Sequence, residues 1–136
     1  MAAHNDVGAF GEALTRHTLA QVAPVQRSAV ADVQCNGVEI EVKTATPSLY
    51  NGKTRGYQFK LYDPGHTDFK RAAVLVLICL DDALNPAAVY VLPTSRLPDK
   101  RTKITIPLSL RSPFNVFRDR WDVIADAYVQ RWGQAQ

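Results

Sequence analysis

The sequence predicts an α/β protein in which one mixed β-sheet is flanked by an N-terminal and a C-terminal helix. Three patterns carry this prediction. Apolar residues recur at helical spacing near both ends of the chain, in residues 5–20 and 112–133. Short runs of strand character, separated by turn residues, fill the region between them. One run, residues 72–80, is apolar throughout, as expected of a central strand covered on both faces.

The composition fits one folded domain spanning residues 1–136. Apolar residues make up 46% of the chain and charged residues 21%, which is typical of globular proteins and excludes a disordered chain. The two cysteines are too few for a disulfide framework or a cysteine-rich zinc site. No apolar run reaches membrane-spanning length and no secretory signal begins the chain, so we expect a cytoplasmic protein with no membrane partner.

Each helix carries a start signal and one apolar face. Asn5 or Asp6 can cap the first helix, which we expect to run for about 16 residues. Four of its residues share one face and are expected to be buried: Val7, Phe10, Leu14 and Thr18. Ser112 and Pro113 begin the second helix, which continues to Gly133. Its apolar residues recur at helical spacing and are interpreted as core packing: Phe114, Phe117, Trp121, Ile124 and Tyr128.

The strands are bounded by residues that favour turns. Asn36-Gly37 separates two strand-like runs, residues 25–35 and 38–44, and predicts a hairpin, because a type I′ turn needs positive φ at both central residues. The remaining strands are expected at residues 57–62, 72–80, 87–92 and 102–106. The basic loops between them are residues 45–56 and 93–101, and Asp63-Pro64-Gly65 is expected to form a turn.

The hairpin turn determines which side chains meet across the two strands. With Asn36 and Gly37 as the turn residues, Asp32 lies directly opposite Glu41, with Cβ atoms about 4.5–5.5 Å apart. Because side chains alternate along a strand, Lys43 lies on the same face as Glu41, whereas Ile40 and Val42 face the other way. We therefore expect one apolar face and one face on which these three charged side chains lie together.

Two opposed carboxylates repel, so another group must offset their charge. Lys43, two residues along the same face, is one candidate, and a divalent cation is another. Mg²⁺ prefers hard oxygen ligands such as carboxylates, with waters and phosphate oxygens completing its octahedron. The alternative is a solvated hairpin face with a single salt bridge, and the register alone does not decide between the two.

Basic residues are concentrated in two segments, although the formal net charge is only +3. Residues 43–71 contain six Lys and Arg against two Asp, and residues 96–120 contain seven against two. All three glutamates lie in the first third of the chain. An acidic spot within a basic chain suits an anionic polymer held near a bound cation. The alternative is a mildly basic, solvated surface with no such partner.

Two segments resemble motifs of the PD-(D/E)XK nuclease superfamily. Asp32, followed on the next strand by Glu41-Val42-Lys43, resembles its signature of an acidic residue, a short gap and then acid-any-Lys. In the first helix, Gly8-Ala9-Phe10-Gly11-Glu12 is similar to the Gly-x-x-Gly-Glu segment of Holliday junction resolvase-like members. The resemblance extends from the first helix to Thr44, and it departs from the family pattern at Ala31, where that pattern has proline.

This resemblance implies a restriction endonuclease-like core and a metal-dependent DNA endonuclease. Size and motif layout are most similar to the Holliday junction resolvase-like members. The residues that would bind Mg²⁺ or Mn²⁺ are Asp32, Glu41 and Val42, the last through its backbone carbonyl. The metal would polarise the scissile phosphate and lower the pKa of a bound water. Lys43 would position that water and stabilise the charge that develops on the phosphate.

Further residues are expected to extend this site toward DNA. Glu12 would add a carboxylate through a water or a second metal, or alternatively pair with Arg16 on the helix surface. Gln58 matches a glutamine that many family members carry after the lysine, although it falls on a strand. Four basic residues are expected to contact DNA: Lys53, Arg55, Lys60 and Arg16. A second group forms another patch or only maintains solubility: Arg96, Lys100, Arg101 and Lys103.

Three functions follow from these observations. The first is a structure-specific endonuclease that acts as a homodimer on branched DNA. The second is a restriction- or repair-type nuclease that acts on duplex DNA. The third is a non-catalytic nucleic-acid-binding module on the same fold. No base-reading module is recognised in the sequence, which favours recognition of backbone and shape, and we expect no small-molecule cofactor.

Overall fold

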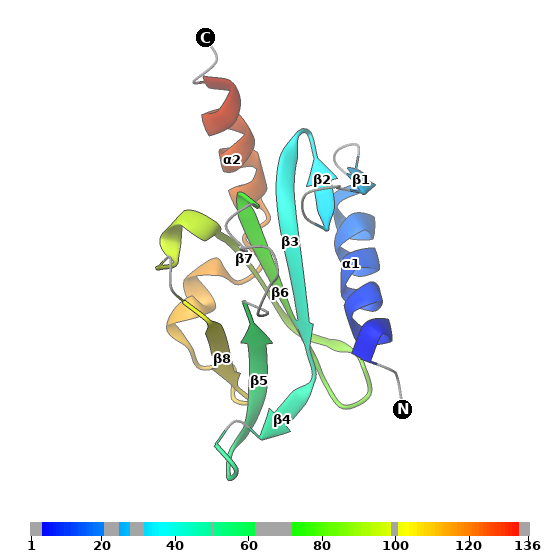
Figure 1. Cartoon of the computed structure of the whole chain (residues 1–136), viewed down its shortest axis with the longest axis vertical. Helices are drawn as coiled ribbons and strands as arrows, with labels where there is room; N and C mark the ends of the chain where they lie inside the picture. The colour runs from blue at the N-terminus through cyan, green and yellow to red at the C-terminus, as the bar shows by residue number, and fades with distance from the viewer. Residues whose placement is uncertain are drawn as a thin grey trace.

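The computed structural model describes residues 4–20, 25–27, 32–49, 51–61, 72–98 and 101–133. Within these ranges the chain forms two α-helices, two short 3₁₀-helices and eight strands (Figure 1). In chain order they are α1 (His4–Ala20), β1 (Val25–Arg27), β2 (Val33–Cys35), β3 (Val38–Ala45), β4 (Pro47–Leu49), β5 (Arg55–Lys60), β6 (Val74–Leu80), β7 (Pro86–Pro93), η2 (Thr94–Arg96), β8 (Lys103–Pro107), η3 (Pro113–Phe117) and α2 (Asp122–Gly133).

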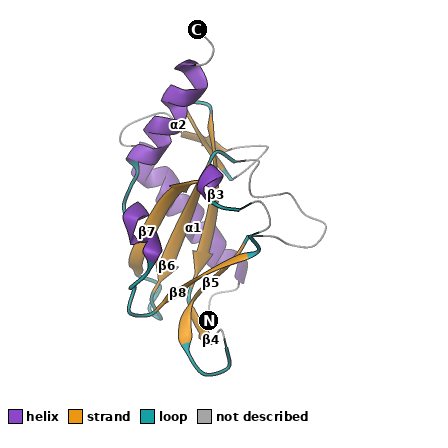
Figure 2. Ribbon diagram, turned by 90° about the vertical axis from the view of Figure 1, so that its left-hand side faces the viewer, coloured by secondary structure: helices purple, strands orange, loops and turns teal. Residues whose placement is uncertain are grey.

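The described elements form three layers, which Figure 2 shows from the side. The larger sheet has the strand order β1-β2-β3-β6-β7, and it is mixed because only β3 and β6 pair in parallel. Apolar residues of α1 and α2 pack together on one face of this sheet. A smaller antiparallel sheet, β4-β5-β8, covers part of the other face. The predicted class, a mixed sheet flanked by two helices, is confirmed, and the small sheet is an addition to it.

Strand β6 lies between two hydrophobic cores, as the apolar run predicts. All seven of its residues are buried. On the helix side the core includes Val74, Val76 and Ile78, whereas on the small-sheet side it includes Leu75, Leu77 and Cys79. None of the helices in the described ranges combines the length and apolar character needed to cross a membrane.

The hairpin has the predicted turn, but the strand before it is shorter than predicted. Asn36 and Gly37 have φ values of 50° and 80°, as a type I′ turn requires. The predicted register holds from Cys35↔Val38 to Val33↔Ile40. Residues 25–35 do not form one strand, because β1 folds back and pairs antiparallel with β2.

The buried face of α1 agrees with the predicted one only in part. Val7 and Leu14 pack against the helix-side core, but they are partly buried rather than fully buried. Gly11, Thr15 and Leu19 are the buried residues of α1, whereas Phe10 is 45% exposed. The reason is a close approach to β3, since a Cβ atom at position 11 would overlap Oγ1 of Thr44. The helix therefore turns the side that carries glycine toward the sheet, rather than the side that carries phenylalanine.

The periodicity predicts one helix for the aromatic run near the C-terminus, but the structure has two, η3 and α2. Ser112 caps the short helix η3, and its Oγ accepts a hydrogen bond from the N–H of Phe114 at 3.1 Å. The chain then runs beside β7, where the N–H of Asp119 donates to the carbonyl of Val89 at 2.9 Å, and α2 begins only afterwards. The predicted stripe is divided between the two cores: Phe114 and Phe117 on the small-sheet side, Trp121 and Ile124 on the helix side, and Tyr128 39% exposed.

The sequence predicts the strands of the small sheet only in part. Strand β4 forms inside the predicted 45–56 loop, and β5 begins at Arg55 rather than at residue 57. Four predicted features lie outside the described residues: the strand end at Tyr62, the Asp63-Pro64-Gly65 turn, the departure at Ala31, and Lys100.

Candidate active site

Asp32 completes the end of the hairpin with its side chain. The regular β2–β3 ladder ends at Val33, and the N–H of Asp32 also donates to the carbonyl of Ile40, at 3.1 Å. Oδ2 of Asp32 accepts a hydrogen bond from the N–H of Val42 at 2.8 Å. The side chain thus takes the place of the backbone acceptor that a longer β2 would offer. The extended register predicts that Asp32 is a ladder partner of Glu41, but the ladder ends one residue earlier. The carboxylate of Asp32 instead reaches along the edge of β3 to the N–H of Val42.

Glu41 and Lys43 lie beside Asp32 on the predicted face of β3. Nζ of Lys43 is 3.4 Å from Oε1 of Glu41, and the two side chains are 28% and 21% exposed. Burial raises the pKa of Glu41 to about 7, with further contributions from the charge of Asp32 and a hydrogen bond with it, while Lys43 opposes the shift. The structure therefore brings these three predicted residues together, and Glu41 is half-protonated near neutral pH when no cation is present.

The backbone carbonyl of Val42 faces the same edge as Asp32. In a β-strand the N–H and C=O of one residue point toward the same neighbouring strand. The N–H of Val42 points toward Asp32, so its carbonyl also points to this edge, where β2 has already ended. The predicted oxygen ligands, two carboxylates and one carbonyl, thus lie along the same edge of β3, beyond the end of β2.

The site lies at the rim of the core between the two sheets. Glu41 and Lys43 are register partners of Leu75 and Leu77 in β6, which are buried in that core. Ala45, the next residue of β3 on this face, already belongs to the core. The charged residues therefore stand at the boundary of this core, where their side chains are partly buried and partly exposed.

Glu12 is placed near β3 but outside the acidic pair. It is half-buried on α1, next to Gly11, which packs against Thr44. In the part of the chain that the structure describes, no three Asp, Glu, His or Cys side chains converge to hold a metal ion. A role for Glu12 through a water or a second metal stays a prediction. Arg16, one turn further along α1, is also half-buried.

The other predicted DNA contacts lie on or beside the small sheet. Lys53 is exposed in the turn after β4, where Oδ1 of Asn51 accepts from its N–H at 3.0 Å. Arg55 forms an exposed ion pair with Asp82, 2.8 Å between nitrogen and oxygen. Gln58 and Lys60 alternate with buried core residues of β5, so they lie on the outer face of the small sheet.

Two members of the second basic group stack on aromatic rings of η3. The guanidinium of Arg96 lies 5.7 Å from the ring centre of Phe117, and that of Arg101 lies 5.8 Å from the ring centre of Phe114. Cation–π contacts of this kind hold the side chains against the protein. Both arginines therefore have a structural role at the edge of the small-sheet core.

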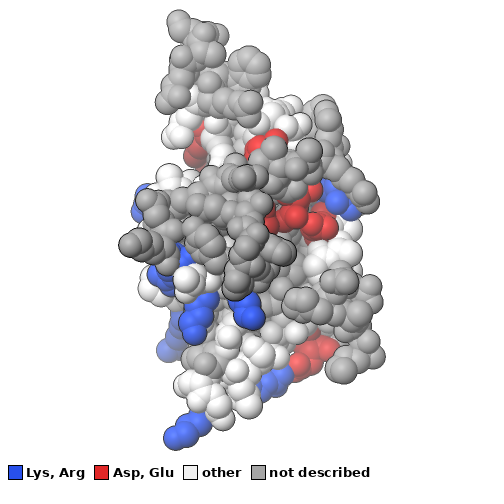
Figure 3. All heavy atoms as spheres, in the orientation of Figure 1, with Lys and Arg blue, Asp and Glu red and all other residues white. Residues whose placement is uncertain are grey.

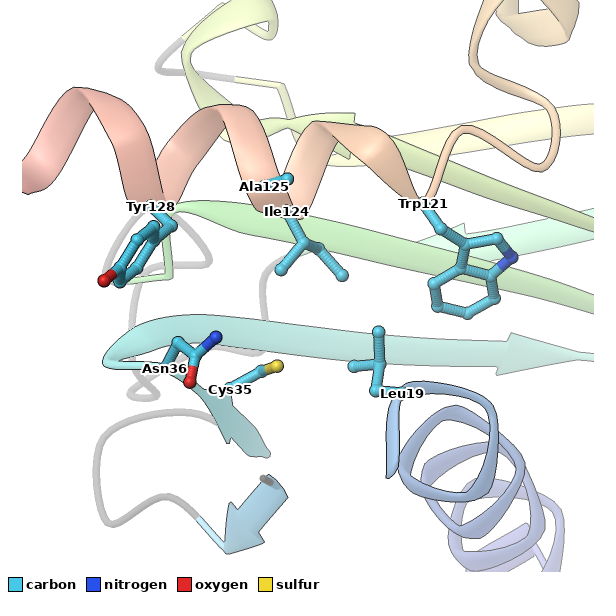
Figure 4. A pocket seen from close by; sticks show the side chains of 7 residues that line it. All are labelled: Leu19, Cys35, Asn36, Trp121, Ile124, Ala125 and Tyr128. Atoms are coloured by element: carbon cyan, nitrogen blue, oxygen red, sulfur yellow. The ribbon is translucent and has the colours of Figure 1, made fainter. Parts of the chain in front are cut away.

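An apolar pocket lies on the helix side, away from the charged residues. It has a volume of about 270 Å³ between the hairpin tip and α2 (Figure 4). Its lining residues are Leu19, Cys35, Asn36, Trp121, Ile124, Ala125 and Tyr128. Burial raises the pKa of the Cys35 thiol, which makes it a poor nucleophile. The described lining of the pocket is therefore mostly apolar and contains no Asp, Glu, His, Lys or Arg.

Comparison of the sequence with protein families and with curated proteins gives no match. Among solved structures, the fold is similar to that of a bacterial homing endonuclease, I-Ssp6803I, with a TM-score of 0.69. The likeness covers 98% of this chain and 99% of that chain, at 14% sequence identity. At this identity the likeness concerns the fold alone, which this chain shares with that structure along nearly its whole length.

Proposed function

We propose that the protein is a metal-dependent DNA endonuclease of the PD-(D/E)XK type, with Asp32, Glu41 and Lys43 in its active site. One observation carries the proposal: Asp32, Glu41 and Lys43 lie together at the edge of β3, and burial beside Asp32 raises the pKa of Glu41. Two carboxylates that retain a proton for want of positive charge form a place where a divalent cation can bind instead. The fold likeness to a homing endonuclease supports the same conclusion.

The residues present fit a hard divalent cation. Asp32, Glu41 and the carbonyl of Val42 would hold Mg²⁺ or Mn²⁺, since Mg²⁺ is usually bound by one or two carboxylates, with waters and substrate phosphates as further ligands. When bound, the ion would polarise the scissile phosphate and lower the pKa of a bound water. The 2.8 Å hydrogen bond from Val42 to Asp32 keeps the carbonyl and the carboxylate in fixed relative positions. Lys43 orients the attacking water and stabilises negative charge on the phosphate.

The proposal takes two forms that differ in substrate. Cleavage of branched DNA is supported by the likeness of residues 8–12 to the Holliday junction resolvase-like segment. Cleavage of duplex DNA is supported by the fold likeness to a homing endonuclease. In both forms we propose a homodimer, because cutting both strands needs two sites and the described residues supply one Asp32–Glu41 pair. Light scattering in solution tests this assembly.

A cleavage assay tests the active site. Labelled four-way junction, linear duplex and single strand are incubated with Mg²⁺ or with Mn²⁺, at physiological salt. We expect cleavage that requires the metal and is lost in Lys43→Ala and Glu41→Gln. Glu39→Gln is the matched control, because Glu39 lies on the same strand and the same face, two residues nearer the turn.

The outcomes separate the three functions. Symmetrical nicking of the junction supports the branched-DNA form, and cutting of plain duplex supports the other form. Wild-type cleavage that Glu41→Gln retains, or that proceeds in EDTA, contradicts the active-site assignment. If the metal binds but no substrate is cleaved, the non-catalytic binding module becomes the better account.

A further inference from the structure

The outer face of strands β5 and β8 carries an ordered set of polar side chains. Gln58 is the register partner of Thr105, and Lys60 is the register partner of Lys103. The residues that alternate with them are all buried in the core between the sheets: Tyr57, Phe59, Ile104 and Ile106. Because the inner rows are apolar and the outer rows are polar, the outer face points away from the protein.

The lysine row is unfavourable for the isolated sheet. Lys60 and Lys103 are both exposed, and directly opposed side chains have Cβ atoms about 4.5–5.5 Å apart. Like charges in this position destabilise an antiparallel pair. With the residues that the structure describes, neither lysine forms an ion pair. An uncompensated pair of cations at one rung is the arrangement that a polyanionic ligand would stabilise.

The rest of the small sheet maintains the same sign of charge. None of its three strands contains Asp or Glu. Figure 3 shows Lys and Arg side chains gathered over β5 and β8, on the same face of the molecule as the acidic side chains near β2 and β3. Basic side chains of the small sheet and acidic side chains near the hairpin therefore lie on one face of the molecule.

We propose that the outer face of β5 and β8 is a groove-binding surface for duplex DNA. The inference rests on the proposed nuclease function, which makes DNA the substrate. The major groove admits a two-stranded β-ribbon. Lys60 and Lys103 contact phosphates, whereas Gln58 and Thr105, the neighbouring rung, face the base edges. Glutamine can form two hydrogen bonds with adenine and threonine can bond to any base, so this rung gives the protein a sequence preference.

Binding is measured in EDTA, so that the result does not depend on cleavage. Fluorescence anisotropy follows a labelled duplex over a range of salt concentrations, with wild type and Lys60→Gln/Lys103→Gln. Each lost phosphate contact lowers the steepness of log K against log salt by about 1, so we expect a reduction of about 2. Arg118→Gln/Arg120→Gln is the charge-matched control, because these exposed arginines precede α2 and lie off the small sheet. Its slope is expected to equal that of wild type.

A second pair of variants tests base reading. Gln58→Ala/Thr105→Ala is expected to keep the salt slope but to reduce the discrimination between selected and random duplexes by roughly tenfold. Selection from a random duplex library with wild type supplies the preferred sequence. Thermal melting checks folding, and the lysine variant is expected to melt at or above the wild-type temperature, because the opposed charges are removed.

The outcomes separate this surface from the active site. If the lysine variant and the arginine control show the same slope, the surface proposal is overturned, even where the wild type cleaves DNA. If the lysine variant shows the reduced slope of log K against log salt while the wild type cleaves nothing, the surface is supported and the nuclease function is not. The proposal is also overturned if the lysine variant has the wild-type affinity for duplex DNA and the same affinity for single-stranded DNA.

Discussion

One oxygen of Asp32 is committed to the backbone. Oδ2 accepts the N–H of Val42 at 2.8 Å, and that N–H is partly buried at the end of the hairpin. The carboxylate therefore has a structural role as a hydrogen-bond acceptor and, in our proposal, a chemical role as a metal ligand. The two roles separate by substitution, because asparagine keeps an oxygen acceptor and loses the charge.

Asp32→Asn and Asp32→Ala are expected to differ in stability but not in activity. Alanine leaves the N–H of Val42 without its acceptor, so Asp32→Ala should lower the free energy of unfolding by about 1–3 kcal/mol. Asp32→Asn should unfold at nearly the wild-type urea concentration. Both should lose about 100-fold or more in cleavage rate, because both remove the charge that binds the metal. Equal stability of the two variants would show that the side-chain oxygen does not support Val42.

Glu41 is expected to make the metal-free protein less stable as the pH rises. Its pKa is raised from 4.5 to about 7 on folding, chiefly by burial. A carboxyl group whose pKa is raised on folding contributes stability below its unfolded pKa, and this contribution is lost as the pH rises through the folded pKa. The contribution is on the order of 2 kcal/mol, after allowance for partial solvent access.

Urea unfolding in EDTA between pH 4 and pH 8 measures this contribution. The free energy of unfolding of wild type minus that of Glu41→Gln should fall between about pH 4.5 and pH 7. Glu39→Gln should follow the wild-type curve, because it leaves the Glu41 carboxyl in place. A difference that stays constant over this range would mean that Glu41 titrates as it does in the unfolded chain.

Among the elements, the contact between α1 and β3 is the one that places the two motif segments next to each other. Gly11→Ala would bring a Cβ atom against Thr44, so we expect a loss of about 1–3 kcal/mol in stability. In the described part of the chain, Oγ1 of Thr44 is buried without a hydrogen-bond partner. The second substitution in Gly11→Ala/Thr44→Ala removes the overlapping atom at no cost in hydrogen bonding, so it should restore part of the loss. Additive losses in a double-mutant cycle would contradict this contact.

The elements that could be predicted are those whose signals are local. Asn36-Gly37 determines both the turn and the register of β2 and β3, so the closeness of Asp32, Glu41 and Lys43 follows from about a dozen neighbouring residues. The break before α2 could not be predicted, because it depends on Asp119 pairing with Val89 of a distant strand.

The lysine row likewise depends on long-range pairing. Lys60 and Lys103 meet only because β5 pairs with β8, and nothing local to either strand specifies that register. The sequence does show the alternation of polar and apolar residues from Lys103 to Ile106, which indicates a half-buried strand. The sequence does not show which strand pairs with it, so it does not show that Lys60 and Lys103 lie side by side.

At the scale of the whole molecule, the helices and the candidate active site lie on opposite faces of the large sheet. The helices cover one face of the large sheet, and the small sheet covers part of the other. The acidic residues stand at the boundary of that partial cover, and the lysine row lies on the outside of the cover itself. In our proposal, a duplex that contacts the small sheet is therefore brought toward the boundary where Glu41 and Lys43 lie partly exposed. This arrangement also means that a cation bound at the acidic pair should stabilise the folded protein as a whole.

A metal that binds the folded state and not the unfolded chain raises the free energy of unfolding by about 2.7 kcal/mol at 100 times its Kd. We therefore expect Mn²⁺ to raise the melting temperature of wild type by several degrees at pH 8. The rise should be smaller at pH 5, because Glu41 is then mostly protonated and the metal must displace that proton. Asp32→Asn and Glu41→Gln should lose the rise, and Glu39→Gln should keep it. Scanning fluorimetry with and without Mn²⁺ makes the comparison, and an equal rise in all four proteins would show that the metal binds elsewhere.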